Sequence, residues 1–225
     1  MSMALTRSAT AYGVRLGRVQ RAAADGTLGD RLAKICILVL FSTMAVRLAK
    51  DAAATGHLTG MLLLASEALV VVLTLFRRSA ATVDRSWKAR ILTLLSTFGP
   101  PLVQPASLTG LAPESVTFVI SAIGLVIVVF GKLSLGRSFG LTPANRGVVS
   151  TGLYRFVRHP IYLGYLTTHV GFVIANPAGW NLMVLLAADA ALLLRAKCEE
   201  RTLAADDAYR AYMGRVHWRV VPGVF

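Results

Sequence analysis

The apolar run SVTFVISAIGLVIVVFGKL, residues 115–133, decides the fold class of this chain, because its only charged side chain is Lys132. A helix of this length spans about 28 Å, close to the roughly 30 Å hydrocarbon core of a bilayer. Other apolar residues also form long blocks rather than alternating stripes. Only 16% of the 225 residues are charged and 55% are hydrophobic, whereas soluble domains have about 25% charged residues. This pattern predicts membrane-spanning helices.

Five further apolar runs extend the pattern on both sides. They cover approximately residues 32–48, 58–76, 91–103, 161–175 and 181–194. The third run of the chain holds Gly99-Pro100-Pro101, where a helix is expected to kink or stop because Pro removes a helix hydrogen bond. The last two runs are short and are joined by a tight turn at 176–180, which predicts a helical hairpin. We therefore predict an all-α, polytopic membrane protein with about six membrane-crossing segments.

Lys and Arg residues alternate with these runs in a way that predicts the topology. They concentrate in residues 1–34, 77–90, 131–158 and 195–225, and the other linkers hold few or none. With six crossings, every basic segment lies on one side of the membrane, and the positive-inside rule makes that side the cytoplasm. Both termini and the active site are therefore expected there. Residues 1–30 are predicted to form a basic arm or an amphipathic segment.

The net charge of +13 and the pI near 10.7 bear on the partners. In a soluble protein they would indicate nucleic acid, but here the basic residues are expected to flank the spans and contact anionic lipids. Membrane lipids are thus predicted partners and nucleic acid is not. Cys36 and Cys198 lack the spacing of a disulfide framework or a zinc site, and His57, His169 and His217 are scattered, so no metal is expected.

A polar stretch, STGLYRFVRHPIY at 150–162, lies where one apolar run has ended and the next begins. Gly152 permits close approach of a ligand. Free backbone amides near the expected helix start at Pro160, together with the cations and His159, favour an anionic or strongly polar ligand. The alternative is a basic interfacial loop that binds lipid headgroups, and the residues alone leave both interpretations open.

A second polar stretch follows the last apolar run. Arg195 and Glu199 are four residues apart and share a helix face. They either form an ordinary ion pair, or Arg195 holds a substrate anion while Glu199 contacts a ligand's cation or ribose hydroxyls. Glu67 and Asp189 lie within predicted spans, where carboxylates face the protein interior and mark either function or interhelical hydrogen bonds. We predict that both polar stretches form one site at the cytoplasmic edge.

The tail is predicted to continue the last span as a cytoplasmic helix. Residues 199–213 are good helix formers without Pro or Gly, and Gly214 is expected to end the helix. The closing segment RVVPGVF, 219–225, is expected to be extended and to pack back on the protein.

Taken together, several motifs resemble the isoprenylcysteine carboxyl methyltransferase family. They are Gly-Arg-Ser-Phe at 136–139, the stretch 146–164, Asn176-Pro177, Arg195 with Glu199-Glu200, Tyr209 with Tyr212, and Val220 to Gly223. Related phospholipid methyltransferases share Arg-His-Pro-x-Tyr followed by Glu-Glu. The resemblance covers residues 115–225, which we predict to be the catalytic region, and leaves 31–114 as N-terminal transmembrane helices.

The resemblance implies an integral membrane methyltransferase that uses S-adenosylmethionine and a lipophilic or lipidated substrate. The implied cofactor contacts are Arg146, Gly147, Val148, Val149, Tyr154, His159, Pro160, Ile161, Tyr162 and Glu199. Arg195 is implied to bind the substrate's carboxylate. Family members often have His at the position of Arg146, so a backbone contact is implied there.

The chemistry of methyl transfer assigns two possible catalytic roles. A carboxylate or thiolate acceptor needs only alignment and exclusion of water, and Arg195 offers a planar two-point clamp. An amine or hydroxyl acceptor needs a base, for which Glu200, Asp189 and Glu67 are the candidates. A carboxyl group of the prenylated-cysteine type is favoured by the resemblance, and other lipid N-, O- or S-acceptors remain open.

Two other classes of function stay open at this stage. Membrane sterol and lipid reductases, which use NADPH, resemble the C-terminal region as well, and titration with each cofactor separates them from methyltransferases. A basic, lipid-anchored protein without enzymatic activity would bind neither cofactor.

Overall fold

The computed structural model describes residues 35–36, 38–75, 82–83, 86–106, 109–135, 144–145 and 148–225. Leu40–Phe225 forms one compact unit. The regular elements among its described residues are helices, apart from one antiparallel pair of two-residue strands, β1 (Thr82–Val83) and β2 (Ala144–Asn145). The predicted helical fold class is thus confirmed. The expectation for residues 1–30 lies outside the described residues.

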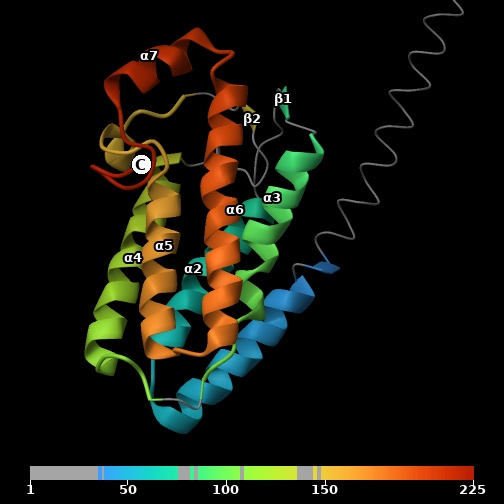
Figure 1. Cartoon of the computed structure of the whole chain (residues 1–225), viewed down its shortest axis with the longest axis vertical. Coiled ribbons are helices and arrows are strands. Elements are labelled where there is room, and N and C mark those ends of the chain that lie inside the picture. The colour runs from blue at the N-terminus through green and yellow to red at the C-terminus, as the bar shows by residue number, and fades with distance from the viewer. Residues whose placement is uncertain are drawn as a thin grey trace, which may run out of the picture. The chain divides into compact units, whose positions relative to one another are not determined.

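The helices of this unit run mainly along one direction. They are residues 40–55, α2 (Thr59–Leu75), α3 (Trp87–Phe98), α4 (Glu114–Leu135), α5 (Pro160–Ala175), α6 (Gly179–Leu203) and α7 (Asp207–Arg215), with short 3-10 turns η1 (Pro100–Leu102) and η3 (Gly152–Arg155). In Figure 1, α4, α5 and α6 follow the long axis, with α7 and the C-terminus at one end and the α5–α6 connection at the other. The end of the molecule that holds the C-terminus therefore also carries α7 and the C-terminal end of α6.

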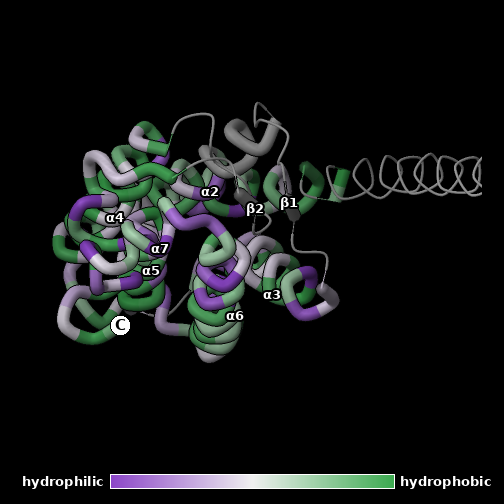
Figure 2. The backbone as a smooth tube through the Cα atoms, turned by 90° about the horizontal axis from the view of Figure 1, so that it is seen from above, coloured by the Kyte–Doolittle hydropathy of each residue, from purple (hydrophilic) through white to green (hydrophobic). Residues whose placement is uncertain are grey.

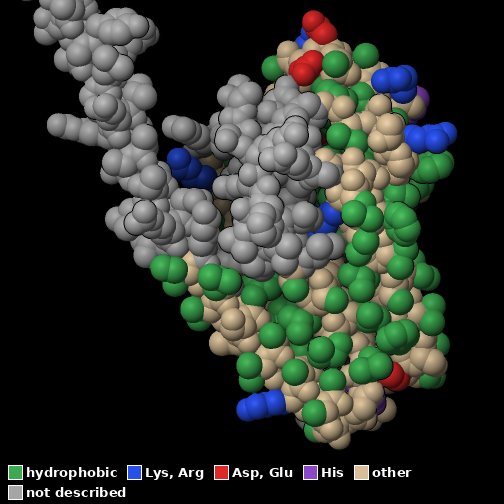
Figure 3. Space-filling model, turned by 180° about the vertical axis from the view of Figure 1, so that it is seen from behind, with side chains coloured by type: hydrophobic (Ala, Val, Ile, Leu, Met, Phe, Trp, Pro, Cys, Tyr) green, Lys and Arg blue, Asp and Glu red, His purple; other side chains and the backbone are tan. Residues whose placement is uncertain are grey.

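Among the residues that the structure describes, two helices, α4 and α6, are long and apolar enough to cross a membrane by length and composition, and the 16-residue α5 is a shorter apolar helix. Figure 3 shows many hydrophobic side chains along the middle and lower part of one face, and charged side chains toward both ends, more of them at the upper end. Figure 2, seen from that end, shows hydrophilic residues along α7 and the adjoining end of α6. Six crossings and a membrane hairpin of α5 and α6 stay predictions.

The Gly-Pro-Pro sequence stops α3, as expected. The helix ends at Phe98, and Pro100–Leu102 forms the separate turn η1. At the other end of α3, the Ser86 side chain accepts a hydrogen bond from the backbone N–H of Ala89, which satisfies one of the free donors of the first turn. The start and the end of α3 are thus both determined by local sequence.

Small residues bring pairs of helices into close contact. A Cβ added to Gly164 of α5 would lie 2.7 Å from the carbonyl oxygen of Gly124 in α4. One added to Gly99, just after α3, would lie 2.7 Å from the Cβ of Ala188 in α6. Small residues allow such backbone approach between membrane helices. As a result, α5 packs chiefly against α4, and α6 packs chiefly against α3.

The prediction of one continuous helix through 199–213 is wrong. Helix α6 continues to Leu203, the chain turns at 204–206, and α7 then runs past Gly214 to Arg215. The Asp206 side chain accepts a hydrogen bond from the N–H of Ala208. An Asp side chain that bonds to nearby backbone favours a helix start over helix continuation, which explains the break.

Candidate active site

The polar stretch 150–162 is joined to the end of the chain through its backbone. The N–H of Arg158 donates to the carbonyl oxygen of Trp218 (2.9 Å), and the N–H of His159 donates to that of Arg219 (2.7 Å). Val220 is completely buried beside them. The expected packing of the tail against the protein is confirmed, although 221–224 form a turn. These two amides before Pro160 are therefore occupied by the tail and not free for an anion, contrary to expectation.

Glu200 of α6 is the centre of this junction. Its carboxylate accepts hydrogen bonds from Nε of Arg158 and Nε of Arg219, each at 2.7 Å. Nε2 of His159 lies 3.3 Å from Oε1 of the same carboxylate, and Arg158 also donates to the carbonyl oxygen of Val216. Arg158, His159 and Glu200 are all buried. We call these four side chains, Arg158, His159, Glu200 and Arg219, the rim cluster.

Glu199 faces a different partner from its neighbour. Its Oε2 accepts a hydrogen bond of 2.9 Å from the Tyr162 hydroxyl. The Tyr162 ring in turn stacks on His159, with ring centroids 5.1 Å apart and planes inclined by 17°. The adjacent carboxylates are thus separated in role: Glu200 binds cations of the rim cluster, while Glu199 lies next to an aromatic surface.

Arg195 is a buried cation, with 5% of its surface exposed. Its Cζ lies 5.5 Å from the centroid of the Tyr162 ring, and its Nη1 lies 3.4 Å from Oγ of Ser96. Among the residues that the structure describes, Arg195 has no carboxylate partner, and its Nε has no hydrogen bond. The ordinary ion pair with Glu199 is therefore not formed. A buried charge without a counter-ion is costly, and an anionic ligand would relieve that cost.

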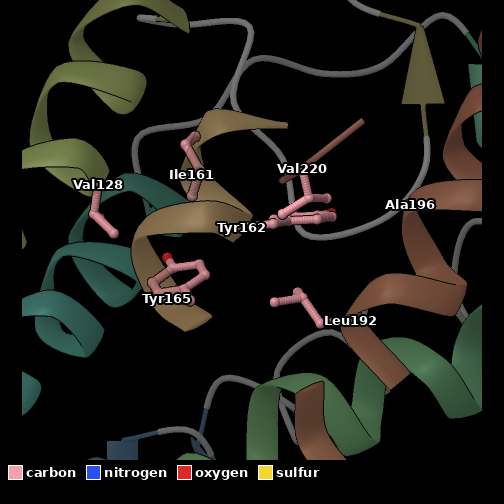
Figure 4. Close-up of a cluster of buried hydrophobic side chains, with 7 residues drawn as sticks. All are labelled: Val128, Ile161, Tyr162, Tyr165, Leu192, Ala196 and Val220. Atoms are coloured by element: carbon pink, nitrogen blue, oxygen red, sulfur yellow. The ribbon is translucent and has the colours of Figure 1, made fainter. Parts of the chain in front are cut away.

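An apolar layer supports Tyr162 from below. Ile161 and Tyr162 pack with Leu192 and Ala196 of α6 and with Val220 of the tail. Figure 4 shows Tyr162 extending from α5 toward the part of α6 that carries Ala196. These contacts bury Ile161 and Tyr162 in the first turn of α5. The position of Tyr162 is therefore determined by packing as well as by its hydrogen bond to Glu199. Pro160, the first residue of α5, is buried too.

Three tyrosines close the site on the tail side. Tyr154, Tyr209 and Tyr212 form a buried cluster, against which Val148 and Val149 pack. The Tyr212 hydroxyl donates to the carbonyl oxygen of Tyr154 at 2.8 Å. Burial raises the pKa of Tyr212 to about 12, so the hydroxyl stays protonated and remains a donor.

Gly152 has a structural reason to be glycine. Its φ of +58° is unfavourable for other residues, and a Cβ there would lie 2.3 Å from Oγ of Ser134 at the end of α4. The motif is thus held against α4 at this point. Arg146, Gly147 and the motif 136–139 lie outside the described residues.

Glu67 and Asp189 meet in a second polar cluster around His169. Nδ1 of His169 lies 2.6 Å from Oδ1 of Asp189, and Nε2 of His169 lies 3.6 Å from Oε1 of Glu67. Tyr165 stacks on His169, and Nζ of Lys132 lies 5.1 Å from the centroid of the Tyr165 ring. We call Glu67, Lys132, His169 and Asp189 the deep cluster.

Sequence reasoning missed several members of these clusters. Arg158 was expected either to favour an anionic ligand or to belong to a basic interfacial loop, and not to pair with Glu200. Arg219, and Ser96 beside Arg195, were not singled out. For His169 and Lys132 the signal was present, since an ionisable residue inside an apolar run usually faces other polar groups. For Ser96 no comparable signal exists, because Ser is common in helices of this kind.

Comparison with known proteins supports the class of protein that this fold and site indicate. Residues 115–205 match the model of the isoprenylcysteine carboxyl methyltransferase (ICMT) family. The resemblance expected from the sequence motifs is thus confirmed over α4, α5, α6 and the polar stretch between them. No curated protein matches the chain at a significant level. The family match and the two long apolar helices support an integral membrane methyltransferase.

Proposed function

We propose that the protein transfers a methyl group from S-adenosylmethionine to a lipophilic acceptor in the membrane, and that the acceptor is a carboxylate of the prenylated-cysteine type. The observation that carries this proposal is the buried Arg195, which has no carboxylate partner among the described residues and lies on the helix face of Glu199, one turn away. A guanidinium group in that state is suited to bind a carboxylate through two parallel hydrogen bonds.

The residues around Tyr162 fit the proposed cofactor. Glu199 presents a carboxylate that can accept hydrogen bonds from ribose hydroxyls, and the stacked rings of His159 and Tyr162 offer an aromatic surface for a purine. Val148, Val149 and Tyr154 lie in the adjoining cluster. When bound, S-adenosylmethionine supplies a methyl group already activated by positively charged sulfur.

A carboxylate acceptor needs no proton transfer. Its oxygen forms a bond to the methyl carbon as the methyl–sulfur bond breaks, and the electron pair of that bond remains on sulfur. The protein therefore has to align the reactants and exclude water. Arg195 would supply the alignment. Glu200, already bound by Arg158 and Arg219, is less available as a base, which favours an acceptor that needs none.

The decisive experiment uses the full chain in lipid nanodiscs with methyl-labelled S-adenosylmethionine. A farnesylated cysteine with a free carboxyl group should become labelled, whereas its amide and phosphatidylethanolamine should not. Titration calorimetry should detect S-adenosylmethionine binding and no NADPH binding. Labelling of phosphatidylethanolamine alone would show that the acceptor is an amine and not a carboxylate. Binding of neither cofactor would refute the assignment as an enzyme.

A matched pair of variants tests the cofactor contact. Glu199→Gln should weaken S-adenosylmethionine binding by about 1–3 kcal/mol, the scale of a hydrogen bond to a charged group. Asp207→Asn is the control, because it also removes one carboxylate but its side chain is 92% exposed. Equal cofactor affinity in both variants would reject the role of Glu199.

The proposed site faces the cytoplasm, as the distribution of Lys and Arg predicts. Single cysteines at 80–88 and 140–150 should react with impermeant reagents only from the cytoplasmic side. Labelling of either segment from outside would contradict this orientation.

A further inference from the structure

We propose that Thr93 and Ser96 of α3 form the second half of the acceptor site, by donating their hydroxyl hydrogens to the anion that Arg195 binds. This inference rests on the proposed function and adds positioning residues to it. Both residues lie outside the 115–205 segment that matches the ICMT family. The inference would therefore make α3 the part of this chain that contributes its own specificity for the acceptor.

The first step in the argument is the close packing of α3 on α6. The two helices run in opposite directions, since Gly99 lies against Ala188 while Ser96 lies near Arg195. A side chain would not fit at Gly99, where an added Cβ would come within 2.7 Å of Ala188. Because the backbones approach so closely at Gly99, α3 side chains near this point come within reach of α6, as the contact between Ser96 and Arg195 shows.

The direction of the Arg195 side chain brings it to α3. Side chains on a helix tilt toward its N-terminus, so Arg195 points from its position near the end of α6 back into the bundle. Nη1 of Arg195 is 3.4 Å from Oγ of Ser96, a long and weak contact. The contact shows that Ser96 is a neighbour of the guanidinium group, but it does not satisfy the hydrogen-bond donors of that group.

Two buried polar atoms beside this contact lack partners. Nε of Arg195 and Oγ1 of Thr93 have no hydrogen-bond partner within the part of the chain that the structure describes. Thr93 and Ser96 are three residues apart and share a helix face, and Ser96 bonds only weakly to the carbonyl oxygen of Thr93 at 3.3 Å. Buried polar atoms are rarely left unpaired in native proteins. A ligand between α3 and α6 would satisfy all three side chains together.

The donors define the chemistry of that ligand. Arg195 offers N–H donors in a planar fork, and each hydroxyl offers one O–H donor. A carboxylate is acceptor-only when ionised and has two oxygens with about four lone-pair sites, so both oxygens can face the guanidinium fork while a remaining lone pair accepts from the hydroxyls. A protonated amine has no acceptor for these donors. The set is thus complementary to an anionic acceptor and not to a cationic one.

The test separates binding of the acceptor from chemistry and from cofactor binding. In nanodiscs, Ser96→Ala combined with Thr93→Val should raise KM for the farnesylated cysteine about tenfold or more, the scale for hydrogen bonds to a charged group. The affinity for S-adenosylmethionine should stay as in the wild type. Ser96→Thr, made in place of Ser96→Ala, keeps the hydroxyl and should bring KM most of the way back to the wild-type value. A purely structural role of position 96 does not predict this rescue.

Thr167→Val is the matched control, because it removes a helix hydroxyl that bonds to its own helix at the carbonyl oxygen of Leu163. KM should not change in this variant. Direct titration of the farnesylated cysteine with S-adenosylhomocysteine present gives an affinity that does not depend on turnover. It should show the same loss for the double variant.

The outcomes distinguish the two proposals. If the wild type binds and methylates the carboxylate and the double variant does so equally well, the inference is overturned, the hydroxyls contact water only, and the proposed function stands. If the wild type neither binds nor methylates the carboxylate, the proposed function fails, and the inference fails with it.

Discussion

The rim cluster and the deep cluster use the same kinds of side chains in opposite ways. In the deep cluster the charges are arranged to compensate each other, since His169 lies between the carboxylates of Asp189 and Glu67, with Lys132 near the adjoining Tyr165 ring. In the rim cluster together with the nearby Arg195, cations are in excess. Glu200 takes two arginines and a histidine, and Arg195 keeps no carboxylate among the described residues.

The difference teaches how to separate structural charges from functional ones in a membrane enzyme. A buried charge that is compensated within the protein needs no ligand to offset the cost of its desolvation. A buried charge that lacks a counter-ion is maintained at a cost, and ligand binding is the simplest reason to keep it. This criterion predicts that the deep cluster is structural and that the surplus cation at Arg195 binds a ligand.

The largest effect is expected from breaking the rim cluster. Glu200→Gln would leave the buried Arg158 without its carboxylate, and removal of one partner of a buried ion pair costs about 3–5 kcal/mol. Thermal unfolding in detergent should therefore start at a clearly lower temperature than in the wild type. A Glu200→Gln protein with wild-type stability and no turnover would instead identify Glu200 as a catalytic base, the role that sequence reasoning offered for it.

The deep cluster should respond next. Asp189→Asn removes the charge that faces His169 at 2.6 Å and should cost about 2–3 kcal/mol of stability, since a buried charged group loses its partner. The affinity of the folded protein for S-adenosylmethionine should not change, because among the described residues no hydrogen bond or ion pair joins the cluster to Glu199. A loss of turnover without a loss of stability would show that the deep cluster takes part in catalysis and would remove the contrast between the two clusters.

Arg195→Lys tests the functional side of the comparison. The charge remains but the two-point geometry is lost, so turnover on a carboxylate should fall tenfold to a hundredfold, or about 1.4–2.7 kcal/mol. Stability should change little, because no carboxylate among the described residues pairs with Arg195. With an amine acceptor, in contrast, the Lys variant should stay nearly active.

The smallest effect is expected at Tyr212, in the tyrosine cluster on the tail side of the site. Tyr212→Phe removes one hydrogen bond, to the carbonyl oxygen of Tyr154, and keeps the ring in its apolar contacts. Stability should fall by about 1 kcal/mol, which a thermal melt detects as a small shift. A large loss of cofactor affinity would mean that Tyr212 orders the motif around Tyr154 rather than merely covering it.

The helical fold could be predicted because its signals are local. The apolar run 115–133 lies within α4, and Pro100-Pro101 ends α3 where expected. The break between α6 and α7 was missed, because good helix formers surround Asp206 and only its capping hydrogen bond distinguishes a new helix start from helix continuation. Here a single side-chain contact outweighs propensity over many residues.

The site could be predicted only in part. The polar stretch and the Arg195–Glu199 spacing indicated which residues would meet, and the structure brings His159, Tyr162 and Glu199 together. The partners of Glu200 were beyond reach, since Arg219 lies 19 residues away and no periodicity links them. Contacts between distant segments depend on packing, which a single sequence does not display.

The contacts that Arg219 and its neighbours make with the rest of the rim cluster have a consequence for biosynthesis. Translation delivers Arg158 and Glu200 before the segment 216–219 that completes their contacts. Helices α4 and α5 can therefore leave the ribosome, and begin to insert into the bilayer, while the cluster still lacks Arg219 and the backbone bonds of 218–219. Assembly of the site is thus ordered in time: insertion comes first, and the nascent protein acquires its complete rim only when the segment after α7 folds back.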